Sequence, residues 1–131
     1  MLEQARNVFA GDRYARLTGV EIVAIGDHEA TCTLSLDERH RNARGVAMGG
    51  VLFTLADFCA AVAANSETLN DLRWVSLDSS IHFLAPAGGS ALNAHCTAIK
   101  HGRNNALYQT AIKSLDDGKT VAIVETTMVK A

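Results

Sequence analysis

Residues 49–65 read GGVLFTLADFCAAVAAN, a run in which only Thr54 and Asp57 are polar before Asn65. As an α-helix, a run of about 17 residues spans roughly 25 Å. A helix that is apolar on all sides has to be buried on nearly every side. The many alanines favour the helical state and keep the helix slender. We therefore expect one long central helix, with the carboxylate of Asp57 enclosed by the rest of the chain.

The segments around this helix alternate apolar and polar residues, as half-buried strands do. The expected strands cover residues 20–25, 29–36, 75–83, 91–100, 106–115 and 119–130. Turn residues favour two hairpins, one at Gly26-Asp27 and one at residues 116–119, DDGK. A short helix is expected at 12–17, with Asp12 as its N-cap and Gly19 beyond its end. The fold class that follows is α+β, a curved antiparallel sheet wrapped around one long buried helix.

The composition is that of an ordinary globular chain. The chain has 131 residues, of which 48% are hydrophobic and 20% charged, so we expect a single domain spanning residues 1–131. The net charge of −2 argues against a nucleic acid or a membrane surface as partner. The three cysteines, Cys32, Cys59 and Cys96, are widely spaced and form no disulfide or metal pattern, which is typical of a reducing compartment.

The sequence shows neither a targeting segment nor a cofactor motif. Residues 1–13, MLEQARNVFAGDR, lack the apolar stretch of a signal peptide. The apolar run 46–64 has the length of a membrane span, but a carboxylate in mid-membrane would cost about 2.5–3.5 kcal/mol. We therefore expect a cytoplasmic protein. Patterns for a zinc site, a P-loop, a dinucleotide-binding loop or a serine nucleophile elbow do not occur, so no metal and no cofactor is expected.

The candidate catalytic groups are Asp57 and the two glycines at the start of the expected helix. Residues 45–72 contain no Lys or Arg, so the carboxylate of Asp57 has no cation near it along the chain. It either hydrogen-bonds a neighbouring strand or serves in proton transfer or nucleophilic attack. The N–H groups of Gly49 and Gly50 either form a tight turn into the helix or polarise a carbonyl oxygen, to which Asn42 adds a side-chain donor.

An ordered set of motifs gives the sequence a family resemblance. The set comprises His40, Asn42 and Gly45, then MGG at 48–50, LAD at 55–57, VSLD at 75–78, FLAPA at 83–87 and HGR at 101–103. It resembles the hotdog-fold acyl-CoA thioesterases, and among them the phenylacetic-acid-degradation (PaaI-type) group, over residues 12–130. The resemblance implies a helix wrapped by an antiparallel sheet, in homodimers that usually pair into homotetramers.

The resemblance also implies roles for individual residues. Asp57 matches the catalytic carboxylate, which acts as a general base on water or as the nucleophile. Gly49 matches the glycine whose backbone N–H polarises the thioester carbonyl. Asn42 matches the amide that assists there, and Ser76 the hydroxyl that orients the attacking water. The family's site crosses the dimer interface, so Asp57 is expected to face the partner subunit's Gly49 and the partner's Asn42. The reaction implied is hydrolysis of an acyl- or aryl-CoA to free acid and CoA.

Substrate-binding positions follow from the same resemblance. They are His40, Met48 and Gly50 beside the thioester, and His101, Gly102 and Arg103 beside the nucleotide phosphates of coenzyme A. The alternative for residues 101–103 is a plain exposed hairpin end. The family usually has histidine where this chain has Met48, which neither donates a hydrogen bond nor carries charge. The alternative function is therefore a non-catalytic acyl-CoA-binding protein. An acyl-thioester hydratase or dehydratase is disfavoured, because the His and acidic pattern of those enzymes is not evident.

Overall fold

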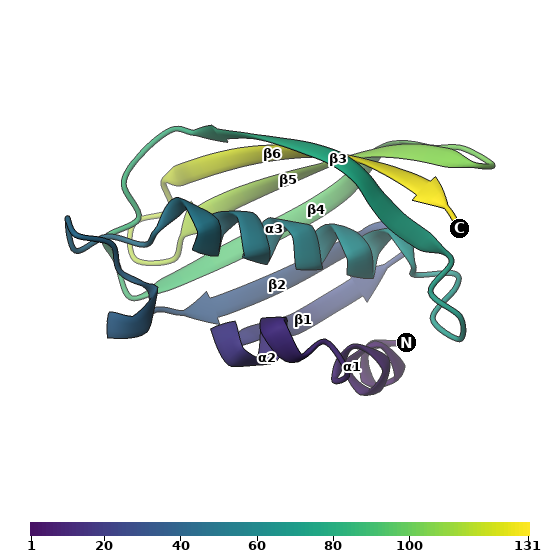
Figure 1. Cartoon of the computed structure of the whole chain (residues 1–131), viewed down its shortest axis with the longest axis horizontal. Helices are drawn as coiled ribbons and strands as arrows, with labels where there is room; N and C mark the ends of the chain where they lie inside the picture. Colours follow the sequence, from purple (N-terminus) through teal and green to yellow (C-terminus); the bar gives the residue numbers. More distant parts are fainter.

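The computed structural model describes residues 1–131 as three α-helices, one short 3₁₀ helix and six strands. In chain order these are α1 (Leu2–Phe9), α2 (Arg13–Thr18), β1 (Val20–Gly26), β2 (Glu29–Ser35), η1 (Glu38–His40), α3 (Gly49–Ala64), β3 (Trp74–Phe83), β4 (Ala91–His101), β5 (Asn105–Ser114) and β6 (Thr120–Lys130). The strands form one antiparallel sheet in the order β1-β2-β4-β5-β6-β3. The sheet curls around α3, while α1 and α2 lie beside β1 (Figure 1).

The expected α+β class is confirmed, and every predicted element lies within one residue of its predicted bounds. Local chemistry explains this agreement. At the start of α2 the Asp12 side chain accepts a hydrogen bond from the Ala15 N–H at 3.1 Å, and Gly19 follows the helix with a left-handed φ of 101°. The hairpin between β5 and β6 turns at Gly118, whose φ is 75°. These signals act over a few residues and can therefore be read from the sequence.

One side of α3 carries the core of the molecule. Leu55, Cys59 and Ala63 are fully buried, and the Cys59 Sγ lies 3.4 Å from the carbonyl oxygen of Ala30 on β2. The alanines let the helix sit close to the concave face of the sheet, as a slender helix does. No helix of the structure is both long and apolar enough to cross a membrane.

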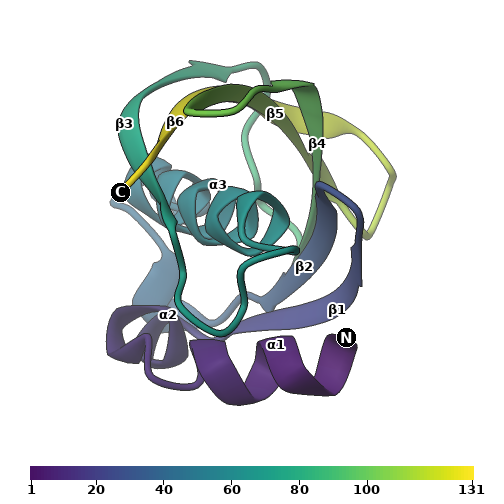
Figure 2. The ribbon, with the colours of Figure 1, turned by 90° about the vertical axis from the view of Figure 1, so that its right-hand side faces the viewer.

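The other side of α3 is open, which corrects the expectation that the helix is buried all round. Gly50 and Asp57 are exposed, and Phe53 and Thr54 are half-buried. Seen from the end of the helix, the strands form an arc from β1 to β3 that leaves one side of α3 without strands (Figure 2). The expectation of an enclosed Asp57 is therefore wrong. A uniformly apolar composition does not reveal which side of a helix its own chain leaves uncovered.

Strand β3 forms one edge of the sheet and pairs only with β6. Its alternation of apolar and polar residues predicts a half-buried strand, but Val75, Leu77 and Phe83 are 45%, 64% and 57% exposed. The register shifts between Ser76 and Asp78, which is a bulge in the edge strand. A long apolar strand with a free edge invites pairing with another strand.

Helix α1 was not predicted. Ala5 and Phe9 are its buried residues, and the Phe9 ring meets the ring of Phe58 on α3 edge-on, with centroids 5.5 Å apart. The Arg6 Nε donates to the carbonyl oxygen of Ile22 at 3.0 Å, which ties the helix to β1. The spacing of its buried residues, four apart, was the available sequence signal.

The end of α3 is tied to the start of β3 by one buried amide. The side chain of Asn65 is 2% exposed. Its Nδ2 donates to the carbonyl oxygens of Ala61 and Trp74 at 2.9 and 3.0 Å. Its Oδ1 accepts from the Trp74 N–H at 2.9 Å and from the Thr68 hydroxyl at 2.8 Å. This network fixes the position of β3 relative to α3.

Replacing Asn65 with Ala is expected to lower the free energy of unfolding by about 2–4 kcal/mol, because the buried Trp74 N–H and C=O each lose a partner at ~1–3 kcal/mol per group. Urea denaturation followed by circular dichroism measures this. The matched control is Asn70→Ala, which removes an exposed amide that bonds only the Gln4 side chain. A loss of equal size in both variants would contradict the structural role of Asn65.

Candidate active site

Asp57 and Ser76 meet on the open side of α3. The Ser76 hydroxyl, from β3, donates to the Asp57 Oδ1 at 3.0 Å, and both residues are exposed. The second carboxylate oxygen of Asp57 has no hydrogen-bond partner in the chain. The fold thus brings together two residues that the sequence analysis placed in one site, and it leaves one carboxylate oxygen free to act.

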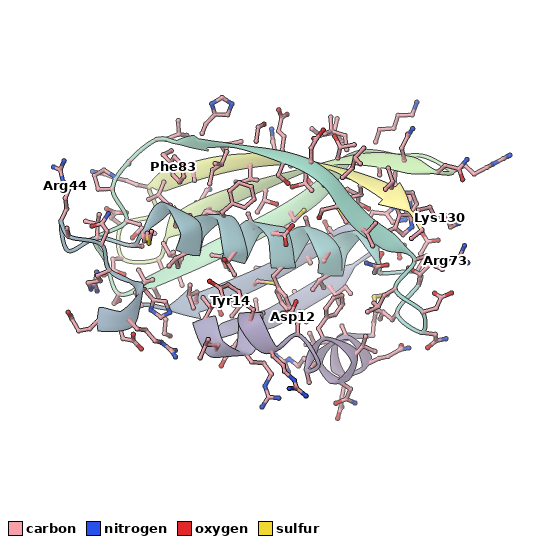
Figure 3. The ribbon with its side chains drawn as sticks, viewed as in Figure 1. Asp12, Tyr14, Arg44, Arg73, Phe83 and Lys130 are labelled. Carbon is pink, nitrogen blue, oxygen red and sulfur yellow. The ribbon has the colours of Figure 1, made fainter.

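A hollow of about 420 Å³ opens beside this pair, between α2 and α3. We call it the Asp57 hollow; its lining residues are Asp12, Tyr14, Ala15, Phe53, Thr54, Asp57 and Phe58. In the side-chain view, Tyr14 and Asp12 are drawn on α2 and at its start, below α3 (Figure 3). Three of the lining side chains are aromatic, so the hollow offers apolar walls next to a carboxylate.

A second hollow, of about 650 Å³, lies at the N-terminal end of α3. We call it the Gly49 hollow; Asn42, Arg44, Gly49, Leu52 and Phe83 are among its lining residues. The N–H groups of Gly49 and Gly50 have no acceptor in the chain, since they open the helix. Such free donors, with the positive end of the helix dipole behind them, suit a developing oxyanion.

A side chain at Gly49 fits only if the exposed ring of Phe83 shifts. A Cβ built there would lie 2.9 Å from the ring of Phe83, which β3 brings over the start of α3. In Figure 3, Phe83 is drawn above this end of the helix, and Arg44 at the tip of the loop before it. Phe83 and the aromatic walls of the Asp57 hollow, Tyr14 and Phe53, were not predicted as site residues.

The Asn42 side chain shapes the loop before α3. Its Oδ1 accepts hydrogen bonds from the N–H groups of Arg44 at 2.9 Å and Val46 at 3.3 Å. Its Nδ2 has no partner in the chain, and Asn42 is one of the residues that line the same hollow as Gly49. A side-chain donor and a backbone donor therefore share one hollow.

Within one chain, the Gly49 donors and the Asp57 carboxylate cannot act on the same carbonyl group. The two residues are eight positions apart on α3, which places them about 12 Å apart along the helix axis. An oxyanion donor has to lie within about 3 Å of the reacting oxygen. The candidate site is thus present as two separated halves.

His40 was expected to bind substrate, but its ring serves the loop instead. It is 3% exposed. Its Nδ1 accepts from the Asp37 N–H at 3.0 Å, so Nε2 carries the proton and donates to the Thr18 carbonyl oxygen at 2.6 Å. With both nitrogens engaged, His40 is not available to a ligand. Met48, in contrast, is 58% exposed as the N-cap residue of α3.

The HGR motif lies at the hairpin between β4 and β5, at the opposite end of the molecule from the loop before α3 (Figure 1). The His101 ring stacks on His28, with centroids 3.7 Å apart and planes 13° apart, and its Nδ1 lies 2.7 Å from the Tyr108 hydroxyl. Gly102 closes the turn by donating its N–H to the Asn105 carbonyl oxygen. The structure thus uses the ring of His101 for packing, while Arg103 is exposed.

The three cysteines are core residues. All are free and buried. Burial raises the pKa of Cys96 to about 12, and a hydrogen bond with Cys32, together with burial, raises the pKa of Cys59 well above its usual value. Thiols held neutral in this way are poor nucleophiles, which leaves the exposed carboxylate of Asp57 as the candidate reactive group on α3. No cluster of three or more His, Cys, Asp or Glu side chains is placed to hold a metal ion.

The chain belongs to the thioesterase superfamily. The sequence profile described by that name matches residues 44–121, which is more than half of the chain and includes the Asp57–Ser76 pair. The predicted resemblance to PaaI-type thioesterases and their hotdog fold is confirmed by individual relatives.

Acyl-coenzyme A thioesterase PaaI of Escherichia coli is 29% identical over 92% of this chain and 84% of its own length. A putative esterase of Haemophilus influenzae is 30% identical over 73% of this chain and 70% of its own length. Among solved structures, the E. coli PaaI protein superposes with a TM-score of 0.90 and 26% identity, covering 98% of this chain and 91% of that one.

His101 gives the stability of the fold a pH dependence, because its pKa is lowered. Burial lowers the pKa of His101, the neighbouring His28 and Lys130 lower it further, and Glu67 opposes them. The unfolded chain then takes up a proton more readily than the folded one. The stability from a neutral His101 is complete above the ordinary histidine pKa of about 6.5 and declines as the pH falls from there toward the lower folded pKa.

We therefore expect the urea concentration at the unfolding midpoint to decrease when the pH is lowered from 7 to 5. The His101→Gln variant should lose part of that slope, since Gln keeps a polar contact to Tyr108 without titrating. His82→Gln, at an exposed histidine on β3, is the control and should keep the wild-type slope. Identical slopes in all three proteins would contradict the assignment.

Proposed function

We propose that the protein is an acyl-CoA thioesterase that hydrolyses an acyl- or aryl-CoA to the free acid and CoA. The observation that carries the proposal is the Asp57 carboxylate, held by Ser76 at 3.0 Å beside an apolar hollow, on the same helix that presents free N–H groups at its start. The E. coli relative PaaI bears the name of this activity. We take the chain to be one thioesterase domain over residues 1–131.

In the proposed reaction, the thioester carbonyl oxygen accepts hydrogen bonds from the Gly49 N–H and the Asn42 Nδ2, which stabilise the oxyanion. The free oxygen of Asp57 removes a proton from water as the water oxygen attacks the carbonyl carbon. The carbon–sulfur bond then breaks, and the proton passes to the departing thiolate. In the nucleophilic variant, the free oxygen of Asp57 attacks the carbonyl carbon itself and CoA departs as the thiolate. Water then hydrolyses the resulting mixed anhydride, which releases the acid, restores the Asp57 carboxylate and supplies the proton for the thiolate. Ser76 serves both routes by fixing Oδ1.

A shared site between two copies resolves the separation of the two halves. We propose an isologous homodimer in which the free edges of the two β3 strands meet, covering the exposed side chains of Val75 and Leu77. Asp57 of one chain then faces the partner subunit's Gly49. The pairing of two such dimers into a homotetramer follows from the family resemblance alone.

The remaining expectations concern coenzyme A and the compartment. Arg103 is exposed at the tip of its hairpin, and a guanidinium there suits the nucleotide phosphates of coenzyme A. Gly102 keeps the turn narrow beside it. Three free, buried cysteines support a reducing, cytoplasmic location.

A second candidate function is acyl-CoA binding without turnover, which the side chain of Met48 favours. Met48 stands at the N-cap of α3, next to the Gly49 N–H, and has no side-chain hydrogen bond to offer. Its flexible thioether suits an apolar acyl group instead. Thiol release from acyl-CoAs, set against calorimetric binding of the same compounds, separates the two functions: tight binding without thiol release would assign the protein to the binding class.

Asp57→Asn is expected to lower kcat about 10²–10⁴-fold, the usual contribution of a positioned acid or base. The fold should be retained, because Asp57 is exposed in the chain and bonds only Ser76. Thiol release measures activity, and a thermal melt followed by circular dichroism measures the fold. Asp27→Asn, an exposed carboxylate in the turn between β1 and β2, is the control. Full activity in Asp57→Asn would rule out the mechanism.

Mixing two inactive variants tests the shared site. Gly49→Pro removes the N–H at the first position of α3, where proline is tolerated. The exposed ring of Phe83 has to move aside for the new Cβ, and the preceding residue already has an extended backbone, with ψ of 144°. Random pairing of Gly49→Pro and Asp57→Asn chains should restore ~25% of wild-type activity, since half of the dimers are mixed and one of their two sites is intact. A site within one chain predicts no recovery on mixing.

A further inference from the structure

A third hollow lies on the far side of α2 from Asp57. It has a volume of about 390 Å³ and is formed by α1, α2 and β1, with Phe9, Val20 and Ile22 among its walls. We call it the α1–β1 cavity. Two residues, Ala15 and Phe58, line both this cavity and the Asp57 hollow. The two spaces are therefore neighbours divided by a thin wall.

Phe58 is the larger part of that wall. Its neighbour on α3, Asp57, is exposed, whereas Phe58 is turned inward and 6% exposed. The ring is held edge-on against Phe9 at 5.5 Å. Ala15, the other wall residue, is 3% exposed and contributes only a methyl group. The aromatic ring of Phe58 thus stands between the carboxylate side and the α1–β1 cavity.

The lining residues of the Asp57 hollow indicate which kind of acyl group it can hold. Tyr14 and Phe53 give it aromatic walls, and aromatic faces and edges pack well against flat apolar groups. Its charged residues are two carboxylates, Asp57 and Asp12, and no cation lines it. A free carboxylate on the acyl group would be repelled by these two side chains. An uncharged apolar acyl group fits this environment.

We propose that Phe58 sets the length of the acyl group: the Asp57 hollow holds one ring or a short chain, which ends against Phe58. This inference rests on the proposed thioesterase function. The α1–β1 cavity is a reserve volume that a longer acyl chain enters only when the Phe58 ring is removed. Phe58 is accordingly a specificity-determining residue, since it limits the substrate without taking part in the bond changes.

The test compares acyl-length profiles. Thiol release is measured for acetyl-, butyryl-, hexanoyl-, decanoyl-, succinyl- and phenylacetyl-CoA. The wild-type protein is expected to prefer phenylacetyl and hexanoyl over decanoyl, and to act poorly on succinyl. In Phe58→Ala, the ratio of kcat/KM for decanoyl to that for phenylacetyl should rise at least about tenfold, the scale on which apolar pockets discriminate.

The matched control is Phe9→Ala. It removes the other ring of the same aromatic pair and enlarges the α1–β1 cavity, but Phe9 does not line the Asp57 hollow. The wall then stays in place, and the wild-type length preference should persist. If Phe58→Ala does not fold, Phe58→Leu provides a smaller opening with a graded shift in the same direction.

The outcomes separate the two claims. No thiol release by the wild-type protein from any of these compounds would overturn the proposed function. If the wild-type protein releases thiol equally well from decanoyl- and hexanoyl-CoA, the role of Phe58 is overturned by the wild-type data alone, and the proposed function stands. An unchanged profile in a folded Phe58 variant, or the same shift in Phe9→Ala, would overturn that role as well.

Discussion

The structure depends on a helix whose apolar surface exceeds what its own sheet covers. Six strands enclose α3 on the side of Leu55 and Cys59, where burial of apolar area stabilises the fold. They leave the side of Asp57 open, bordered by β3 and α2. The same asymmetry places the candidate catalytic carboxylate, the free edge of β3 and the aromatic hollow on one side of the molecule. Stability and the candidate chemistry thus occupy opposite faces of a single element.

The geometry of a straight helix also keeps the N–H donors at the start of α3 apart from the Asp57 carboxylate. Free N–H donors exist only at the start of α3, whereas the carboxylate that Ser76 holds stands two turns further on. A carbonyl group is too small to reach both. This separation is the physical basis for proposing a site shared by two copies, with the exposed β3 edge as the surface that joins them. At the start of the helix, the end of β3 places the ring of Phe83 against Gly49.

Several polar residues of the motif set hold the scaffold rather than the reacting groups. His40 bonds the loop to the end of α2 through both ring nitrogens, and the His101 ring stacks on His28 and contacts Tyr108. Asn65, outside the motif set, ties α3 to β3 with a buried amide. These contacts fix the loop before α3 and the start of β3, so that the donors and the carboxylate are presented by rigid surroundings, as functional groups require.

Local signals in the sequence determined the helix of residues 49–64, the cap at Asp12, the two hairpins and the family, because each depends on side chains a few residues apart or on an ordered motif. Tertiary structure alone decided the strand order, the open side of α3 and the wall that Phe58 forms with Ala15. These features arise from packing between segments distant in the chain. An apolar residue is recorded identically in a sequence whether its own sheet covers it, as with Leu55, or leaves it exposed, as with Leu77. Contacts between distant segments determine which apolar residues are covered, and these contacts exist only in the folded chain.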